Sequence, residues 1–408
     1  MIRIEDKRDC TGCGACVNVC PIQIIVMEED KDGFVYPQVR KDQCIDCHLC
    51  EKICPMLTDE SRIKNSSSKY PLFYAGQLKK KEDLFEVSSG GAFWAFSQAI
   101  LELGGVVYGA VQEDVDTVYH FRADSFNAVK KLRRSKYFQS DTRLTFQQVK
   151  EDLKKGTFVL YSGTGCQIAG LKSYLSKEYS NLITCEVVCH GVPSRRVWKT
   201  YRKEKEESEK KIISDLVFRD KSAGWSHNQY KITYSDGSVE KQASTQQLFH
   251  AGYLEGLFYR PSCGCCRFAS LPRIADVTLA DYWRYKGRFT QQGTDLGVSL
   301  IAINNENGSK ILRLSSRYLD YDTTEKRLAL DSCKHMDEHP SENPNRGNFL
   351  ALFNEVGYYV AANKYITNEV KTSLIKRIAR KLKSLYYKNI IAIQNKLIDG
   401  TQRSYNIL

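Results

Sequence analysis

CTGCGACVNVCP, residues 10–21, recurs as CIDCHLCEKICP, residues 44–55, with an offset of 34 residues. In each copy, the four cysteines are separated by two, two and three residues, and a proline follows the last cysteine. A tight loop with a cysteine at every third position directs only three sulfur atoms toward one centre. Each centre therefore takes its fourth cysteine from the other copy, and the two copies must fold together.

This doubled run is typical of a bacterial ferredoxin domain that carries two 4Fe-4S clusters. By the ligation pattern known for the run, the first cysteine set is Cys10, Cys13, Cys16 and Cys54, and the second cysteine set is Cys44, Cys47, Cys50 and Cys20. A zinc site more often uses two CxxC pairs, and a disulfide framework does not require two identical runs with trailing prolines. The spacing therefore favours iron-sulfur ligation over both.

Composition places the chain among globular, intracellular proteins. Its 408 residues, 42% of them apolar, suffice for two or three domains with their own cores. No apolar N-terminal segment follows Met1, and no run approaches the ~18 apolar residues of a membrane span. Fifteen cysteines without a secretion signal indicate thiolate ligands in a reducing compartment. We therefore expect a cytoplasmic protein.

Charge is distributed unevenly along the chain. Residues 1–60 contain 12 acidic and 7 basic residues, so they carry −5 while the remainder carries +17. The segment from Val370 to Ile398 has many lysines and arginines, no acid, and apolar residues at helical spacing. It predicts a basic amphipathic helix, which either packs on its own domain or lies peripherally on the inner membrane face. Nothing else resembles a nucleic-acid-binding module, so no nucleic-acid partner is expected.

The order of composition changes suggests four parts. Residues 1–60 form the ferredoxin domain, 61–71 a polar linker, 72–350 a larger domain, and 351–408 a helical basic tail. An apolar stretch from Leu72 to Gln77 predicts the strand that opens the larger domain. The expected fold class is an α+β ferredoxin domain followed by a mixed α/β domain.

Two glycine-rich turns in the larger domain each follow an apolar strand and precede an amphipathic helix. The first is Ser88-Ser89-Gly90-Gly91, before a helix from Ala92 to about Leu103; the second is Ser162-Gly163-Thr164-Gly165-Cys166-Gln167, after a strand over Thr157–Tyr161. Such turns can present backbone N–H groups to a phosphate. Each also fits a simple strand-to-helix turn, because the second departs from the GxGxxG fingerprint.

Seven cysteines lie outside the ferredoxin run. Four of them stand at turns beside glycines or prolines, and we call them the downstream set: Cys166, Cys189, Cys263 and Cys266. Their placement suggests that they converge on a third cluster. Cys185, in an apolar strand, is expected in the core, and Cys265 is expected to point away from its two neighbours.

Eight ordered motifs between about residues 72 and 350 resemble the beta subunit of coenzyme F-420 hydrogenase/dehydrogenase. They are Ser89-Gly90-Gly91, Ser135-Lys136-Tyr137, Gly163-Thr164-Gly165-Cys166-Gln167, Cys189-His190-Gly191, Phe218-Arg219-Asp220-Lys221 with Gly224-Trp225, Arg260-Pro261-Ser262-Cys263 with Cys266, Asp276-Val277-Thr278-Leu279-Ala280-Asp281-Tyr282-Trp283, and Gly297-Val298-Ser299-Leu300. Members of that family are iron-sulfur flavoproteins.

The resemblance implies that the larger domain binds FAD and that the downstream set holds a 4Fe-4S cluster beside it. Flavin contacts are implied at Ser89, Gly90, Gly91, Gly163, Thr164, Gly165 and Gln167, and at the Ser135-Lys136-Tyr137 segment. Three positions depart from the family pattern: Gly165 replaces a proline, and Ala280 and Arg284 replace glycines. The last two changes make use of a deazaflavin coenzyme doubtful.

These elements suggest an oxidoreductase that converts between one-electron and two-electron chemistry. Electrons from an external donor such as ferredoxin would pass through the three clusters to FAD and a small substrate, in polysaccharide biosynthesis or deazaflavin metabolism; the reverse direction fits equally. His190, Lys136 and Tyr137 are candidate proton donors because they lie in matched motifs. His190 alternatively orients Cys189, and Lys136 alternatively binds a flavin phosphate. Arg219 and Lys221 are expected to anchor an anion or to pair with Asp220.

Two other function classes remain open. One is an electron-transfer subunit of a larger redox complex, without a substrate site of its own. The other is a redox sensor, which no DNA-binding element supports. A substrate pocket over the flavin would favour the enzyme, whereas an apolar patch near the ferredoxin domain would favour the electron-transfer role.

Overall fold

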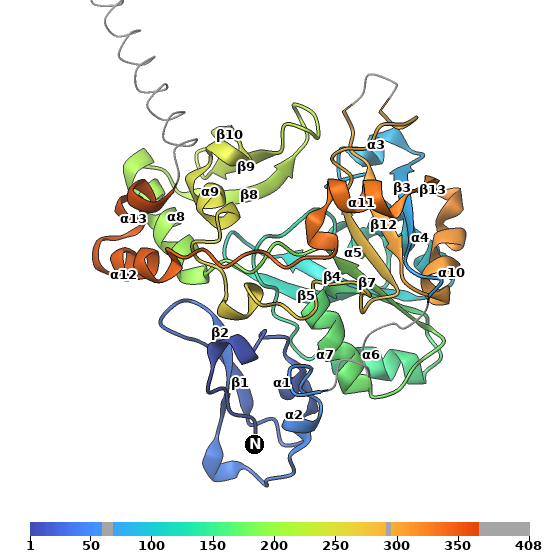
Figure 1. The fold of residues 1–408 in the computed structure, drawn as a ribbon, viewed down its shortest axis with the longest axis horizontal. Coiled ribbons are helices and arrows are strands. Elements are labelled where there is room, and N and C mark those ends of the chain that lie inside the picture. The colour runs from blue at the N-terminus through green and yellow to red at the C-terminus, as the bar shows by residue number, and fades with distance from the viewer. Residues whose placement is uncertain (59–67, 291–294, 367–408) are drawn as a thin grey trace, which may run out of the picture.

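The computed structural model describes residues 1–58, 68–290 and 295–366. Figure 1 shows two parts side by side: a larger part built around an eight-stranded sheet, and a lobe with a three-stranded sheet. The N-terminal unit, drawn in blue, lies below them. In the described part of the chain, no helix has both the length and the hydropathy needed to cross a membrane. The basic segment predicted to form a helix, Val370–Ile398, lies outside the described residues.

The N-terminal unit repeats its backbone as it repeats its sequence. Its elements are α1 (Ala15–Val19), β1 (Ile25–Glu29), β2 (Val35–Val39) and α2 (Leu49–Lys52), and β1 pairs antiparallel with β2. Gly14 precedes α1 with φ +80°, and His48 precedes α2 with φ +57°. Each short helix therefore begins after a left-handed residue at the equivalent position of its cysteine run.

The central sheet has the strand order β13, β3, β12, β11, β7, β6, β4, β5. In chain order the strands are β3 (Leu72–Leu78), β4 (Val106–Gln112), β5 (Val118–Ala123), β6 (Val159–Thr164), β7 (Leu182–Val187), β11 (Val277–Asp281), β12 (Ser299–Ile303) and β13 (Leu319–Thr324). The four inner strands β11, β7, β6 and β4 are parallel, and the outer strands join them through antiparallel pairs.

Helices cover both faces of this sheet. One face carries α4 (Ala92–Glu102), α5 (Phe126–Lys130) and α10 (Glu306–Leu314), and the other carries α6 (Thr145–Lys154) and α7 (Gly165–Leu175). The side chains of successive strand residues point to opposite faces of the sheet. Val107 and Leu160 pack toward α4, while Val106 and Tyr161 pack toward α7. The inner strands are mostly apolar because both of their faces are largely buried. The short helices α3 (Lys81–Leu84) and α11 (Lys326–Ser332) complete this part.

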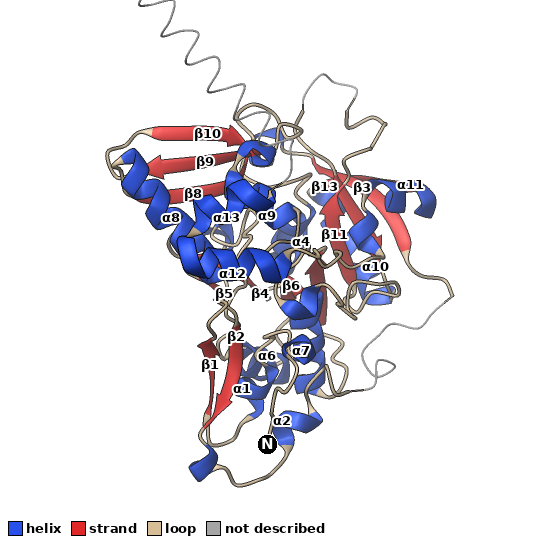
Figure 2. Cartoon of the chain, turned by 60° about the vertical axis from the view of Figure 1, so that its left-hand side comes forward, coloured by secondary structure: helices blue, strands red, loops and turns tan. Residues whose placement is uncertain are grey.

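The lobe has its own aromatic core. It combines β8 (Ile213–Asp220), β9 (Gln229–Tyr234) and β10 (Val239–Ala243) with α8 (Arg195–Glu209), α9 (Leu248–Leu254), α12 (Arg346–Val356) and α13 (Tyr358–Tyr365), as Figure 2 shows. Trp198, Phe249 and Phe349 are buried together in it. The suggested boundary at residue 350 falls inside α12, which packs into this core.

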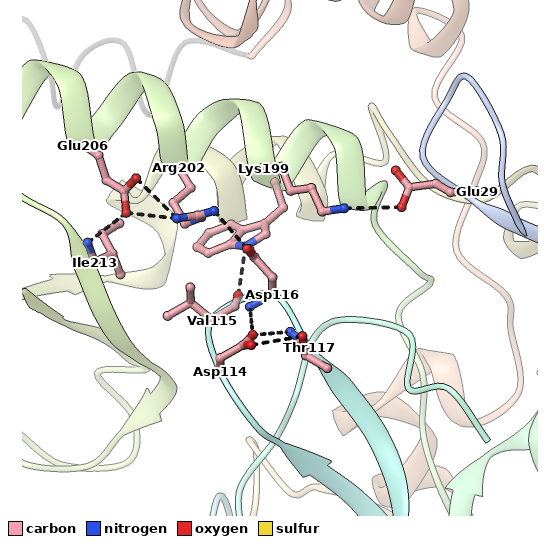
Figure 3. A network of polar contacts seen from close by, with 10 residues as sticks. Glu29, Asp114, Val115, Asp116, Thr117, Lys199, Arg202, Glu206 and Ile213 are labelled. Carbon is pink, nitrogen blue, oxygen red and sulfur yellow. Dashed lines mark hydrogen bonds and ion pairs between the residues drawn. The ribbon is translucent and has the colours of Figure 1, made fainter. Parts of the chain in front are cut away.

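Helix α8 joins three parts of the molecule, as Figure 3 shows. Lys199 forms an ion pair of 3.6 Å with Glu29 of β1, and Arg202 pairs with Asp116 in the β4–β5 turn at 2.9 Å. Glu206 accepts the backbone N–H of Ile213, where β8 begins. The same helix therefore contacts the N-terminal unit, the central sheet and the lobe.

Several expected elements are confirmed and one is displaced. β3 and α4 match the predicted strand and helix. The predicted turn Ser162–Thr164 is wrong, because β6 continues to Thr164 and Gly163 pairs with Glu186 of β7. The strand extends because a neighbouring strand satisfies its backbone groups. The mixed α/β architecture is as expected, with a ferredoxin-like region at the N-terminus.

Candidate functional site

The first cysteine set lies around one hollow in the N-terminal unit. A space of about 360 Å³ is lined by Cys10, Cys13, Cys16 and Cys54, together with residues next to these cysteines in both runs. Cys54 reaches it from the second run, 34 residues after its counterpart Cys20. The geometry therefore has the crossed arrangement that the ligation pattern predicts.

The second cysteine set lines a second hollow of about 360 Å³. Cys44, Cys47 and Cys50 surround it, and Cys20 joins them from the first run. Cys47 is exposed, and so are the neighbouring Ile22, Ile45 and Leu49. This hollow therefore lies at the outer end of the unit, whereas the first faces the rest of the molecule.

The downstream set meets at one edge of the central sheet. Cys166 lies in the first turn of α7, directly after β6, and Cys189 lies two residues after β7. Because β6 and β7 are adjacent and parallel, their carboxyl ends reach the same edge. The CxxC pair comes to that edge as well, since the Val192 N–H donates to the Cys263 sulfur at 3.4 Å.

The thiols of the downstream set act on one another electrostatically. Burial raises the pKa of Cys263, and the neighbouring Cys189, Cys266 and Cys166 raise it further. Burial also raises the pKa of Cys189 to about 11 and that of Cys266 to about 12. Four partly buried thiols that repel each other as thiolates need a cation to hold them deprotonated. The donor set therefore fits a thiolate-bound metal cluster.

A single metal ion fits less well. Across residues 1–58, 68–290 and 295–366, no three His, Cys, Asp or Glu side chains lie close enough to hold one ion. Each thiolate of a four-iron cluster binds a different iron atom, so these thiols lie farther apart than the ligands of one ion. Cys185 is buried in the core and Cys265 is exposed, so neither joins the set. The ligand roles of the twelve cysteines stay predictions.

The first cysteine set and the downstream set are neighbours. Helix α7, which begins at Gly165, packs on the first set: a Cβ placed on Gly170 would lie 3.1 Å from the Cys13 sulfur. Burial raises the pKa of the Cys166 thiol, and Thr11, next to Cys10, opposes that rise. One helix therefore has Cys166 in its first turn and the Cys13 sulfur against its middle.

Polar contacts fix the N-terminal unit at this junction. The Gln139 amide donates to the carbonyl oxygens of Thr11 and Gly12 at 2.9 and 3.1 Å. The Thr142 hydroxyl donates to Cys13 O at 3.2 Å, and the Asn18 amide donates to Arg143 O at 2.8 Å. These bonds lie inside or beside a buried interface, so they hold the first cysteine set in one orientation toward the sheet.

The first turn implied to contact flavin packs closely against neighbouring strands of the protein. A Cβ on Gly90 would overlap Gly76 O, and one on Gly91 would overlap the Leu78 side chain. Ser89 donates to Val298 O at 2.8 Å. These glycines and this serine are therefore explained by close packing of the turn on β3 and β12.

The second turn is likewise engaged in internal contacts. Thr164 and Gln167 form a capping box for α7, and the Gln167 amide donates to Ser140 O at 3.1 Å. A Cβ on Gly163 would lie 3.1 Å from the Gln167 side chain, and one on Gly165 would lie 3.2 Å from Glu186 Oε2. These contacts explain the residues of both turns by internal packing, and the flavin contacts stay a prediction.

The three candidate proton donors are not gathered around one point. His190 and Tyr137 each contact the ring of Tyr253, with centroids 5.6 Å apart in both cases. Burial lowers the pKa of His190 to about 4, so its ring is neutral near pH 7. Lys136 instead donates to Arg133 O at 2.5 Å, and burial lowers its pKa to about 7.

Arg219 and Lys221 have partners other than the expected ones. The Arg219 guanidinium pairs with Asp281 at 2.7 Å rather than with Asp220, because β8 points it at the end of β11. Lys221 donates to three carbonyl oxygens, those of Leu84, Ser89 and Leu296. Both cations therefore hold neighbouring loops together.

Two buried ionisable residues were given no role in the sequence analysis. Glu186, fully buried on β7, lies 3.4 Å from Arg273 and leaves its Oε2 without a hydrogen-bond partner. Arg260, 1% exposed, lies between the N-terminal unit and the downstream set. Only the position of Arg260 three residues before Cys263 could have marked it.

Two family models match separate parts of the chain. Residues 9–57 match the 4Fe-4S dicluster domain, and residues 156–327 match the model for the C-terminal part of the coenzyme F420 hydrogenase/dehydrogenase beta chain. The chain therefore carries an N-terminal 4Fe-4S dicluster domain, followed by a region similar to the C-terminal part of the coenzyme F420 hydrogenase/dehydrogenase beta subunit. The second match contains the whole downstream set, and the first contains both ferredoxin cysteine sets.

Individual relatives match short stretches of the chain. One subunit of the H(2):CoB-CoM heterodisulfide,ferredoxin reductase of Methanothermobacter marburgensis is 37% identical over 65 residues, which are 13% of this chain and 10% of that protein. An uncharacterized ferredoxin of Methanocaldococcus jannaschii is 40% identical over 48 residues, 11% of this chain and 71% of that protein. The match thus spans about a tenth of the reductase protein.

One solved structure is similar over a longer range. A chain of the F420-reducing NiFe hydrogenase complex from Methanosarcina barkeri aligns with a TM-score of 0.43 and 15% identity, over 68% of this chain and 92% of that one.

Proposed function

We propose that this chain is an iron-sulfur electron-transfer subunit of a larger redox complex, with a third 4Fe-4S cluster held by the downstream set. The observation that carries the proposal is the contact between the two cysteine sets through α7, whose first turn contains Cys166 and whose Gly170 packs on Cys13. When bound, such clusters exchange one electron each. The chain contributes their thiolate ligands and their spacing.

Backbone N–H groups at the cysteines support this role. The N–H groups of Gly12 and Gly191 lie 3.4 Å from the sulfurs of Cys10 and Cys189. The N–H of Ile2 lies 3.2 Å from the Cys50 sulfur. Hydrogen bonds to sulfur stabilise the more negative, reduced state of a cluster. Each set has at least one such donor, which would tune the reduction potential of its centre.

Electron entry is proposed at the second cysteine set. Cys47 is exposed there, and Ile45 and Ile22 expose 62% and 43% of their surfaces beside it. An apolar rim around an exposed centre suits a short-lived contact with a one-electron carrier such as ferredoxin. The first set, held against the sheet, would then pass charge inward.

The flavin-dependent enzyme is the second candidate function, and it rests on the similarity of residues 156–327 to the beta-subunit model. It adds FAD and a small substrate, in polysaccharide biosynthesis or deazaflavin metabolism. The turns at Ser89–Gly91 and Gly163–Gln167 make close internal contacts, which account for their residues without a flavin.

Anaerobic titration with dithionite separates these candidates by counting electrons. Three clusters accept about three one-electron equivalents per chain, and an added flavin raises the count to about five. We expect about three for the protein, about two for Cys263→Ser, and no change for the matched control Cys265→Ser. About two equivalents in the unaltered protein would contradict the third cluster, and about five would favour the enzyme.

A further inference from the structure

Arg260 is a buried cation at the boundary of two cysteine sets. It is 1% exposed and lies three residues before Cys263 of the downstream set. Its Nε donates to Cys10 O at 2.8 Å, and its Nη2 lies 3.6 Å from the Cys10 sulfur. One side chain therefore joins the segment of Cys263 to the first cysteine set.

The rest of the guanidinium is held by neutral groups. Nη2 also donates to Val35 O at 2.9 Å, Nη1 approaches Gln139 Oε1 at 3.3 Å, and the carbon of the guanidinium lies 4.3 Å from the centre of the Tyr36 ring. These contacts come from the N-terminal unit and from the larger part of the molecule. A planar fork with several donors can make them all at once, whereas a lysine ammonium cannot.

Arg260 differs from the other buried arginines in its counter-charge. Arg219 pairs with Asp281 and Arg273 lies beside Glu186. Over residues 1–58, 68–290 and 295–366, no carboxylate forms an ion pair with Arg260. A buried charge without a partner is costly, so such charges are normally compensated. The groups facing Arg260 that would carry negative charge as cluster ligands are the Cys10 sulfur and, electrostatically, the Cys166 sulfur.

We propose that Arg260 is a shared counter-charge of the first cysteine set and the downstream set, and that it raises the reduction potential of the centre held by the first set. Each electron that a cluster accepts adds one negative charge, which a nearby buried cation stabilises. The effect on the first set rests on the ferredoxin ligands alone. Only the effect on the downstream set rests on the proposed third cluster.

Potentiometric titration of the anaerobic holoprotein, followed by electron paramagnetic resonance, tests the proposal. The component that disappears in Cys16→Ser identifies the first set. In Arg260→Gln, we expect this component to need a lower potential, with its oxidised-to-reduced ratio changed about tenfold, or about 59 mV for one electron. Arg260→Lys keeps the charge but not the fork, so its shift should lie between those of Arg260→Gln and the unaltered protein.

Arg195→Gln is the matched control. Arg195 donates to Gln139 O at 2.8 Å, so it is a cation at the same interface that binds a carbonyl oxygen rather than a cysteine. Its removal should leave the potential of the first set unchanged. If Arg260→Gln loses iron, the test relies on Arg260→Lys, for which we expect an intermediate shift of the reduction potential. Unchanged potentials in the folded Arg260 variants, or an equal shift in Arg195→Gln, would overturn the proposal.

Failure of this proposal is distinguishable from failure of the proposed function. A count of two electron equivalents in the unaltered protein would contradict the third cluster. The potential of the first set could still be measured in the Arg260 variants. Three equivalents together with unchanged potentials would remove the role of Arg260 and leave the third cluster in place.

Discussion

Gly14 and His48 occupy equivalent positions in the two cysteine runs, and their surroundings explain why only one of them is glycine. Both have a positive φ, +80° and +57°. A Cβ on Gly14 would overlap Thr142 Oγ1 in the interface with the larger part of the molecule. His48 is exposed and contacts Glu51 at 2.6 Å. The first run therefore needs glycine at this position because it packs against the larger part of the molecule. The second run is exposed there and accommodates a side chain.

Gly14→Ala should weaken this docking. The new methyl group would collide with Thr142 and strain the left-handed backbone, so we expect the free energy of unfolding to fall by about 1–3 kcal/mol. His48→Ala, at the equivalent exposed position, should change it by no more than about 0.5 kcal/mol. Anaerobic urea unfolding of both variants measures the difference, and equal losses would count against the docking interpretation.

Two buried histidines predict how stability depends on pH. Burial lowers the pKa of His250 to about 3 and that of His120 to about 4, against 6.5 for an exposed ring. Between pH 6.5 and 4, the unfolded chain therefore binds protons that the folded chain does not, and the free energy of unfolding falls as the pH falls. Above pH 6.5 both states are neutral and the contribution is constant.

His250→Gln should make this dependence shallower. In the unaltered protein, the lowered pKa of His250 should reduce the free energy of unfolding by roughly 3 kcal/mol as the pH falls from 6.5 to 4. The variant should lack this reduction. His227→Gln, which alters an exposed histidine, is the control and should keep the original slope. Chemical unfolding across this range measures both, and parallel curves for the unaltered protein and His250→Gln would contradict the assignment.

Among the secondary-structure elements, adjacent parallel strands explain why distant cysteines meet. β6 and β7 end at one edge of the sheet, and the segments after them place Cys166 and Cys189 there. The strand periodicity and the turns already indicated this from the sequence. The sequence did not show that β6 runs on to Thr164, because the glycine suggested a turn and the pairing with β7 depends on a distant segment.

The crossed arrangement of the two ferredoxin runs is testable with double variants. Since Cys13 and Cys54 line one hollow, Cys13→Ser with Cys54→Ser should lose no more iron than either single change. Cys13→Ser with Cys20→Ser should remove both centres, because Cys20 lines the other hollow. Iron analysis after anaerobic reconstitution decides this. The opposite pattern would mean that each run holds its own centre.

For the whole molecule, local patterns indicated candidate ligands but not the environment around them. Cysteine spacing marked the two ferredoxin sets, and turns marked the downstream set; all three stay predictions. The partners of Arg219 and Arg260 could not be predicted in this way. Arg219 binds Asp281 across 62 residues and Arg260 binds Cys10 across 250, so only the folded chain brings these groups together.

The described molecule therefore has a directional arrangement of its cysteine sets. The second set is at the outer end of the N-terminal unit, the first set is against α7, and the downstream set is at the sheet edge. Hydrogen bonds from Gln139 and Thr142 fix the first set in this order. A rigid sequence of centres is what electron transfer needs, since its rate depends on their separation.

Anaerobic determination of iron and acid-labile sulfide per chain tests whether the three cysteine sets hold three clusters. We predict about twelve irons and twelve sulfides for the unaltered protein and for Cys265→Ser, and about eight of each for Cys263→Ser. Eight irons in the unaltered protein, with no further loss in Cys263→Ser, would contradict the presence of a third cluster.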